Sequence, residues 1–245
     1  MNILLLVTFT VAFLSSIVSG ISGGGGGFVM TPYFLLIGFS PQQIVGGGSV
    51  ASLGLGGSSL LAMRGQKLIH KKFLWPLMIL TLISTVLAMS VLPKISGNTF
   101  QIVIGFLLII LAPTLFIKKA RFQPGQRSKK SIYAGYFVYA GILFASALGS
   151  GLATLLFLPL LFLMGLTALE ANATRRVLML MQSAITFCIV LPQGFIIWSH
   201  TLASLAGCWI GGHIGTKIAL KKGDKFVKIG LATVMVLSGL GLILL

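Results

Sequence analysis

The chain reads Ser22-Gly23-Gly24-Gly25-Gly26-Gly27-Phe28-Val29-Met30-Thr31-Pro32 near its N-terminus, with five consecutive glycines inside a long apolar stretch. Glycine in a helix interior is less favourable than alanine by about 1 kcal/mol, because it loses more backbone entropy. Five glycines in a row therefore predict that the helix breaks here. A second helix is expected to restart near Phe28.

The residues around this break indicate a membrane protein. No charged side chain occurs between Met1 and Met63, and of the 245 residues 56% are hydrophobic and only 8% charged. A soluble domain has about 25% charged residues. Other uncharged runs can also hold spans of about 20 residues. We predict an all-α integral membrane protein with about 8 hydrophobic helical segments, within a range of about 6 to 10.

The basic residues give the expected topology. Lys and Arg number 18 against 2 acids, a formal charge of +16, and they fall in short clusters between apolar runs. This pattern indicates membrane orientation rather than nucleic-acid binding. The positive-inside rule predicts a multi-pass protein of the cell inner membrane with these basic loops in the cytoplasm. The three clusters are Arg64, Lys67, Lys71, Lys72; Lys118, Lys119, Arg121, Arg127, Lys129, Lys130; and Lys217, Lys221, Lys222, Lys225, Lys228.

A self-comparison at an offset of 127 predicts two repeats. It superimposes pairs in matching hydrophobic profiles, namely Gly24 on Gly151, Pro32 on Pro159, Gly38 on Gly165 and Val50 on Val177. We expect a first membrane repeat at 1–117, a basic cytoplasmic linker at 118–130 and a second repeat at 131–245. The basic loop 64–72 aligns with the uncharged stretch 191–199, so the repeats are expected to have inverted topology, as in many secondary transporters.

The glycine stretch lies between two short predicted limbs. Leu4–Val18 and Phe28–Phe39 would be helices of about 22 and 18 Å, shorter than the hydrocarbon core of about 30 Å. Short limbs favour a re-entrant hairpin, although two full spans stay open. In the second repeat, Arg175 and Arg176 precede the predicted helix Val177–Ile197, and Leu202–Ile218 returns to the third basic cluster.

A broken helix at membrane depth is a candidate binding site. Its backbone groups need partners, which buried protein or a water-lined cavity provides. The restarting helix presents free N–H groups and the positive end of its dipole, which favour an anion. Close helix packing by small residues is the alternative. From the two breaks we select Ser22, Gly23, Gly25, Gly26, Gly27 and Thr31, with Gly149, Ser150, Gly151 and Thr154 as their counterparts.

Other polar residues in apolar surroundings are further candidates. Asn172, Thr174 and Arg175 could bind a carboxylate or sulfonate, since guanidinium groups form bidentate contacts with such anions. Anchoring of Arg175 to lipid headgroups is the competing interpretation. His213 lies inside an apolar segment and Glu170 is one of the two acids, so both are candidates for coupling transport to protons. Packing for His213 and ion pairing for Glu170 stay open.

At the glycine motif the chain resembles the sulfite exporter TauE/SafE family, whose halves open with G-x-G-G-G, four residues and a proline. Residues 23–32 match this pattern position by position, and Pro159, Gly165, residues 170–174 and the spaced glycines of 207–215 extend the resemblance over nearly the whole chain. The sequence departs from the pattern at residues 150–154, which lack the triple glycine, and at Arg175, which replaces a serine.

The resemblance implies a permease for small anions such as sulfite, sulfonates or sulfoacetate-like compounds, generally in the direction of export. The residues themselves favour an anion, and only the resemblance suggests sulfur. Alternating access by rocking one repeat against the other is the expected mechanism. A passive anion channel and a non-transporting membrane subunit are the alternatives. No enzyme signature, metal-ligand spacing or cofactor motif occurs, so we expect no enzyme activity, metal or cofactor. The expected partners are a small anion and the lipid bilayer, with homodimerisation left open.

Overall fold

The computed structural model describes residues 3–24, 26–69, 71–91, 129–148, 165–227 and 229–230. These residues form helices joined by short connections, with no strand among them. The all-helical fold class is therefore confirmed for the described residues. The longer helices are α1 (Ile3–Ser22), α2 (Gly26–Leu36), α3 (Pro41–Ala62), α4 (Lys71–Val91), α6 (Lys129–Leu148), α7 (Ala168–Val190) and α8 (Trp198–Lys222), with the short 3-10 helix η5 (Leu191–Gln193).

The helix breaks at the glycines, as predicted. The α1 helix ends at Ser22 and α2 begins at Gly26, two residues earlier than expected. At 20 residues, α1 is about 30 Å long, so the prediction of a short first limb was wrong. The 11 residues of α2 extend only about 17 Å, which is too short to cross a hydrocarbon core of about 30 Å.

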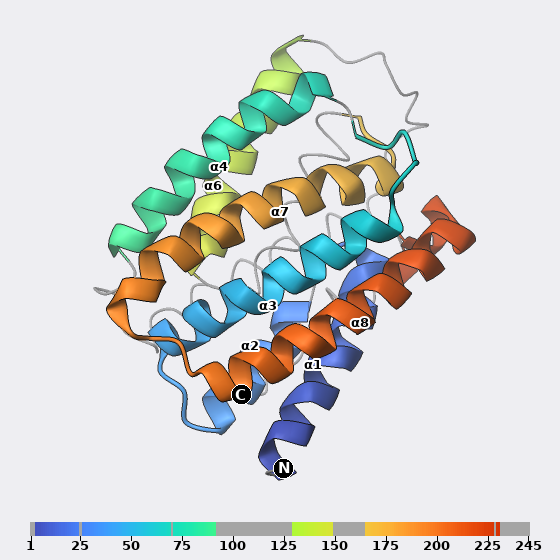
Figure 1. Cartoon of the computed structure of the whole chain (residues 1–245). Coiled ribbons are helices and arrows are strands. Elements are labelled where there is room, and N and C mark those ends of the chain that lie inside the picture. Colours follow the sequence, from blue (N-terminus) through green and yellow to red (C-terminus); the bar gives the residue numbers. More distant parts are fainter. Residues whose placement is uncertain are drawn as a thin grey trace.

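The helices pack in two groups that meet between α3 and α7. Figure 1 shows α8, α3, α7 and α4 following one another across the molecule, with α1 behind α8 and α6 behind α4. Helices α1, α3 and α8 form one group, the α1–α3–α8 group. Helices α4, α6 and α7 form the other, the α4–α6–α7 group. Each group combines helices from both sequence halves, because α8 packs on α1 and α3 while α4 packs on α6 and α7.

Glycines bring α1 and α8 into backbone contact. Gly207, Gly211 and Gly215 recur every four residues along α8 and face the backbone of Phe9, Phe13 and Ile17. A Cβ added at Gly207 would lie 2.6 Å from the carbonyl oxygen of Phe9. Small residues at this spacing allow the close helix approach that is common in membranes. The spaced glycines of α8 therefore serve packing.

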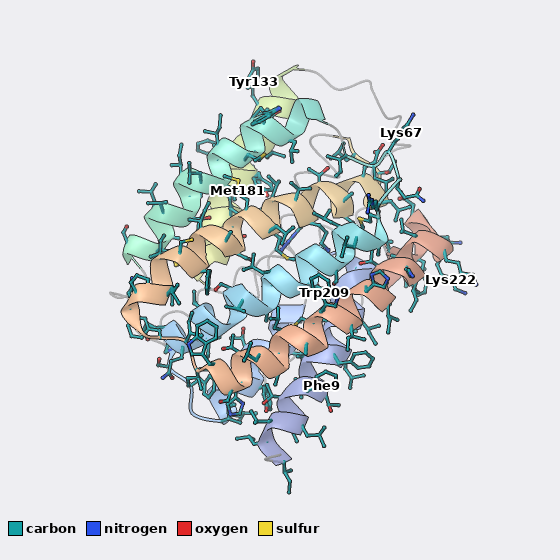
Figure 2. The ribbon with its side chains drawn as sticks, in the orientation of Figure 1. Phe9, Lys67, Tyr133, Met181, Trp209 and Lys222 are labelled. Atoms are coloured by element: carbon teal, nitrogen blue, oxygen red, sulfur yellow. The ribbon has the colours of Figure 1, made fainter. Side chains whose placement is uncertain are left out.

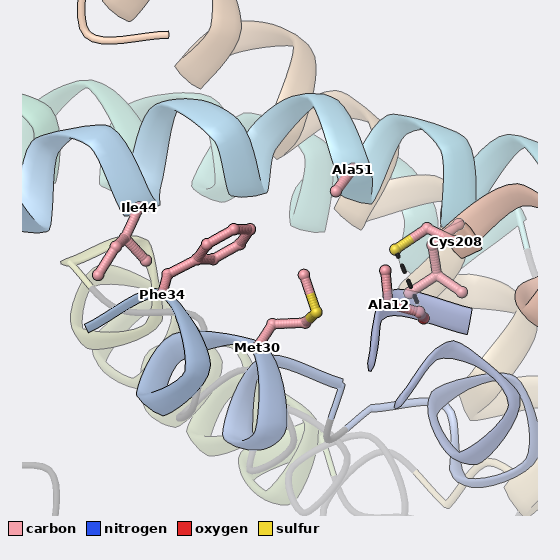
Figure 3. Close-up of a cluster of buried hydrophobic side chains, with 7 residues drawn as sticks. Ala12, Met30, Phe34, Ile44, Ala51 and Cys208 are labelled. Atoms are coloured by element: carbon pink, nitrogen blue, oxygen red, sulfur yellow. Dashed lines mark hydrogen bonds between the residues drawn. The ribbon is translucent and has the colours of Figure 1, made fainter. Parts of the chain in front are cut away.

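The short α2 helix is held by an apolar cluster beneath α3. Figure 3 shows Met30 and Phe34 of α2 pointing toward Ile44 and Ala51 of α3, with Ala12 of α1 and Cys208 of α8 beside them. All of these side chains are buried. The cluster fixes the position of α2 although this helix is too short to span a bilayer.

The outer surface is apolar, as a lipid-facing surface must be. Four helical segments are long and apolar enough to cross a membrane, judged by length and composition: Ile3–Ser22, Pro41–Ala62, Leu74–Val91 and Ala168–Gln193. Exposed side chains include Ile79, Leu82, Ile83, Val86 and Leu87 along α4. These features are those of a multi-pass membrane protein.

The ends of the described helices differ in charge. Figure 2 shows Lys67, after α3, and Lys222, at the end of α8, on the same side of the molecule, and both are exposed. The helix α7 also begins on this side. We call it the basic end. The opposite end holds the connection between α7 and α8, which carries no charged residue.

Candidate functional site

The α1–α2 break is closed by its own hydrogen bonds. Gly23 has a φ of +77°, which glycine adopts readily, and its N–H donates to the Ser19 carbonyl at 2.7 Å. The buried Ser22 hydroxyl has a single proton, and two backbone carbonyls lie within hydrogen-bond reach of it, that of Val18 at 2.9 Å and that of Gly24. Ser22 therefore stabilises the turn instead of presenting its proton to a ligand. Gly26 and Gly27, which are both half-buried, occupy the first turn of α2.

Arg176 lies beside this break with its side chain fully buried. Its Nη2 donates to the Ser19 carbonyl of α1, and its Nε donates to Oδ1 of Asn172 at 3.2 Å. Its Nη1 lies 3.8 Å from the Met179 sulfur, a weak acceptor. A guanidinium has five N–H groups, so these contacts leave donor capacity at the break.

Asn172 and Ser19 connect Arg176 to the glycine hairpin. Asn172 donates through Nδ2 to the Gly20 carbonyl at 3.4 Å, one turn from Arg176 on α7. A Cβ added at Gly26 would lie 3.3 Å from Cβ of Ser19. The N-terminus of α2 and the guanidinium of Arg176 therefore meet at Ser19. This geometry brings a buried positive charge and the positive end of a helix dipole to one place.

The partners of Arg176 are electrically neutral. They are a carbonyl, an amide and a thioether, and none is a carboxylate. A buried charge is costly unless it is paired, and an arginine at the centre of a bilayer costs about 2.5 to 3.5 kcal/mol in insertion measurements. The break therefore holds a buried positive charge with no carboxylate partner.

The two acids of the chain are used at the start of α7. Thr167 and Glu170 form a capping box, in which the Thr167 N–H donates to Glu170 Oε2 at 2.8 Å. Asp224, which follows α8, accepts from the N–H groups of Ala168 and Leu169 at 3.0 and 2.8 Å. Negative charge at a helix N-terminus is stabilising. The structure thus gives Glu170, a candidate for proton coupling, a capping role.

Arg175 and Arg176 lie inside α7 and not at its beginning. The predicted start at Val177 was wrong, because α7 begins at Ala168 behind the Thr167 cap. Arg175 is 2% exposed, which contradicts anchoring to lipid headgroups. It interacts electrostatically with Tyr139 of α6, whereas Arg176 contacts α1. The two neighbouring arginines therefore reach different helix groups. Thr174 is also fully buried, and its hydroxyl has no hydrogen-bond partner.

His213 lies in the contact between α8 and α3. Its Nδ1 is 3.2 Å from the Ser58 carbonyl, and the hydroxyl of Thr216, one turn later, donates to Ser59 Oγ at 3.0 Å. These contacts fit a packing role. Thr31 is half-buried in α2. The remaining predicted site residues, Gly25, Gly149, Ser150, Gly151 and Thr154, lie outside the described part of the chain.

Sequence reasoning missed a polar cluster at the end opposite the basic end. Thr8 Oγ1 lies 2.6 Å from the Tyr33 hydroxyl and 2.9 Å from Nδ1 of His200, whose ring packs edge-on against Phe39. The cluster joins the beginning of α1, the second half of α2 and the beginning of α8. It shows that the α1–α2 hairpin returns to the end from which it starts.

Sequence reasoning also undervalued Arg176 and Ser19. A signal for Ser19 was present, because Thr8, Ala12, Ser15, Ser16 and Ser19 follow one another at helical spacing along α1 and are all buried. Small polar residues at intervals of three and four mark the packed face of a membrane helix. Arg176 differs from Arg175 only by its position on α7, which depends on where that helix begins.

The fold and the buried polar groups define the class as an all-helical, multi-pass membrane protein. Comparison with known families makes the assignment specific. The model of the sulfite exporter TauE/SafE family matches residues 8–242, and the chain belongs to this family. The resemblance of the glycine motif is thereby confirmed.

Three relatives of similar length support membrane transport. A "Probable membrane transporter protein ORF9" from Sinorhizobium sp is 24% identical over 92% of this chain and 87% of the relative. A "Probable membrane transporter protein" from Haemophilus influenzae is 23% identical over 92% and 89%. The "Probable membrane transporter protein YunE" of Bacillus subtilis is 24% identical over 97% and 96%. No solved structure matches the chain. The protein is a membrane transporter by family, in agreement with the expectation of a non-enzyme.

Proposed function

We propose that this protein is a secondary transporter that exports a small sulfur-containing anion such as sulfite or a sulfonate. The observation that supports an anion is Arg176, a buried cation with neutral partners beside the N-terminus of α2. The family name supports sulfur and export. A sulfite or sulfonate oxygen would accept from the remaining guanidinium N–H groups and from the first N–H groups of α2.

We propose that two inverted repeats form this transporter, and several pairs of features 127 positions apart support them. The helices α4 and α8 begin at Lys71 and Trp198, and the N-caps of α3 and α7 are Ser40 and Thr167. Both caps are capping boxes, and glycines with positive φ precede them at Gly38 and Gly165.

Corresponding helix contacts support the repeat further. Ser84 of α4 donates to the Ala140 carbonyl of α6, and the equivalent residues Gly211 and Phe13 meet between α8 and α1. The packing of α8 on α1 and α3 likewise corresponds to that of α4 on α6 and α7. We therefore propose that the moving bodies are the two helix groups, each of which takes one helix from the other sequence half.

The orientation follows from the charge. We propose that the basic end faces the cytoplasm, and that the connection between α7 and α8 lies on the outside of the inner membrane. Single cysteines in place of Lys67 and Gln193, which are both exposed, should react with an impermeant thiol reagent from opposite sides. Reaction of both from one side would contradict this orientation.

The anion site is tested by binding to the purified full-length protein. We expect calorimetry to detect sulfite or a simple sulfonate in the wild type, weaker binding in Arg176→Lys, and a loss of about 10- to 100-fold or more in Arg176→Gln, which removes charge-assisted hydrogen bonds. Arg64→Gln at the exposed basic end is the matched control and should bind as the wild type does. Thermal unfolding verifies that each variant is folded.

Two results would overturn the proposal. One is the absence of sulfur-anion binding to folded wild-type protein, and the other is unchanged binding by folded Arg176→Gln. Direction is measured in vesicles loaded with sulfite, with the protein inserted in a known orientation. Flux that saturates with sulfite concentration supports a carrier, whereas flux that stays linear to high concentration supports a channel.

A further inference from the structure

The α4–α6–α7 group contains buried polar groups without partners. Three side-chain oxygens in the described part of the chain are buried and lack a hydrogen-bond partner: those of Thr85 on α4, Tyr139 on α6 and Thr174 on α7. Each of these residues is fully buried. Buried hydroxyls are nearly always hydrogen-bonded, and an unpaired one costs about 1 to 3 kcal/mol. One such oxygen on each of three adjacent helices requires an explanation.

Two of these hydroxyls lie where α4 and α6 touch. Ser84 Oγ donates to the Ala140 carbonyl at 3.4 Å, which places the neighbouring residues Thr85 and Tyr139 at the same helix contact. The adjacent threonine of α4, Thr81, gives its proton to the Leu77 carbonyl at 2.7 Å. The Thr81 hydroxyl lies beside that of Tyr139, but its proton is used within its own helix, so the hydroxyl protons of Thr85 and Tyr139 are left without an acceptor.

A buried cation reaches the same place from α7. Arg175 is 2% exposed and interacts electrostatically with Tyr139. Its neighbour Arg176 contacts Ser19 of α1 on another face of α7. The helix α7 thus carries two buried guanidinium groups, one toward each helix group. The Arg175 group is accompanied by hydroxyls that can still donate.

We propose that Arg175, Tyr139 and Thr85 form a second binding site for a small oxyanion, separate from the one at Arg176. An oxyanion such as sulfite accepts hydrogen bonds on several oxygens, so it can accept from a guanidinium and two hydroxyls together. This inference rests on the proposed function in one respect, namely that the transported anion is the ligand. Two sites on different faces of α7 would let one anion occupy each helix group.

The site is tested with Tyr139→Phe, which deletes the unpaired oxygen and keeps the ring. Tyr136→Phe on the same helix is the matched control. Equilibrium dialysis with sulfite should find two anions per wild-type chain, both retained in Tyr136→Phe. Tyr139→Phe and Thr85→Val should lose one of them or bind it at least about 10-fold more weakly. Arg176→Gln should lose the other and keep the one that depends on Tyr139.

Stability gives a second readout. Without anion, Tyr139→Phe should unfold at the same temperature as the wild type or higher, because an unsatisfied group has been removed. With sulfite, its melting temperature should rise less than that of the wild type. A single anion per wild-type chain, or unchanged binding in folded Tyr139→Phe, would overturn the second site alone. No binding in the wild type would overturn the proposed function as well.

Discussion

The two helix groups are built differently at equivalent contacts. In the α1–α3–α8 group, Gly211 of α8 lets the backbone of α1 approach directly, whereas Ser84 of α4, 127 positions earlier, reaches the backbone of α6 through a hydroxyl. Hydroxyls of the first group are largely satisfied, as Ser58 bonds to Leu55 and Thr216 to Ser59. Unpaired hydroxyls remain in the second group.

This difference indicates that the two helix groups differ in rigidity. Backbone contact through glycine fixes the distance between α1 and α8, since no side chain that could change rotamer lies between Gly211 and the backbone of Phe13. A hydroxyl contact of 3.4 Å between Ser84 and the Ala140 carbonyl is long and can adjust. We infer that the α1–α3–α8 group is the rigid one and that adjustment on ligand binding occurs mainly in the α4–α6–α7 group.

Exchanging the residues at the two equivalent contacts, Gly211 and Ser84, is expected to change the free energy of unfolding more than any other substitution proposed below. Gly211→Ser should destabilise the protein by about 1 to 3 kcal/mol or more, because the new side chain meets the backbone of Phe13, which cannot move aside. Ser84→Gly should cost about 1 kcal/mol or less, from the lower helix propensity of glycine. Thermal unfolding in detergent and the yield of monodisperse protein measure both.

Gly141 of α6 provides the control for this comparison. A Cβ added there meets nothing within 4 Å, so Gly141→Ala should be neutral or should stabilise by about 0.5 to 1 kcal/mol. Equal melting temperatures for Gly211→Ser and the wild type would contradict the rigid contact between α1 and α8.

Disulfide cross-links sharpen the assignment of the two moving groups. A Cβ at Gly47 of α3 lies 3.0 Å from the Thr201 Oγ1 of α8, and one at the adjacent Gly46 lies 2.9 Å from a methyl of Val190 on α7. In a background with both native cysteines replaced, the pair at Gly47 and Thr201 joins helices of one group. The pair at Gly46 and Val190 joins the two groups.

We expect the cross-link within the group to leave most sulfite transport intact and the cross-link between groups to stop it, with recovery after reduction. Flux into or out of vesicles before and after a reducing agent is the measurement. Transport that survives a complete cross-link between Gly46 and Val190 would exclude relative movement of α3 and α7 at this position.

The sequence predicted the membrane fold and the glycine break because both depend on local composition. Five consecutive glycines weaken a helix in any surroundings, and long uncharged runs require a bilayer. The length of α1 was underestimated, since the residues up to Ser22 remain helical until Gly23 adopts positive φ and closes the end on Ser19. Where a helix ends depends on such closing contacts.

The candidate site was only partly predictable because it depends on which helix faces which. Asn172 was selected from the sequence and does contact the α1 end, whereas Arg176 was set aside in favour of Arg175. Which of two adjacent arginines faces α1 is fixed by the start of α7, and that start depends on Thr167 and on Asp224, which follows α8. The spaced glycines of α8 indicate a close helix contact, but the choice of α1 as the partner is a tertiary contact with no local signal.

The N-caps of α3 and α7 are the last pair of equivalent features, and substitutions there are expected to have the smallest effects. Ser40 and Gln43 form a neutral capping box, while Thr167 and Glu170 form a charged one that Asp224 reinforces. Ser40→Ala should therefore cost about 1 kcal/mol, the usual value for a lost N-cap. Asp224→Asn keeps the size of the side chain but loses its charge, and it should cost about 1 to 2 kcal/mol because charge-assisted hydrogen bonds to Ala168 and Leu169 are weakened.

The same change should also affect sulfite binding, since Asp224 holds the first turn of α7, about one turn before Asn172 and about two turns before Arg176. We expect Asp224→Asn to weaken sulfite binding by about 2- to 5-fold, less than a direct contact would give. Ser40 lies at the start of α3, away from the basic end. Ser40→Ala should therefore leave sulfite binding unchanged, although its loss of stability is similar to that of Asp224→Asn. Equal effects of the two variants on binding would show that the α7 cap stabilises the fold without positioning the arginines.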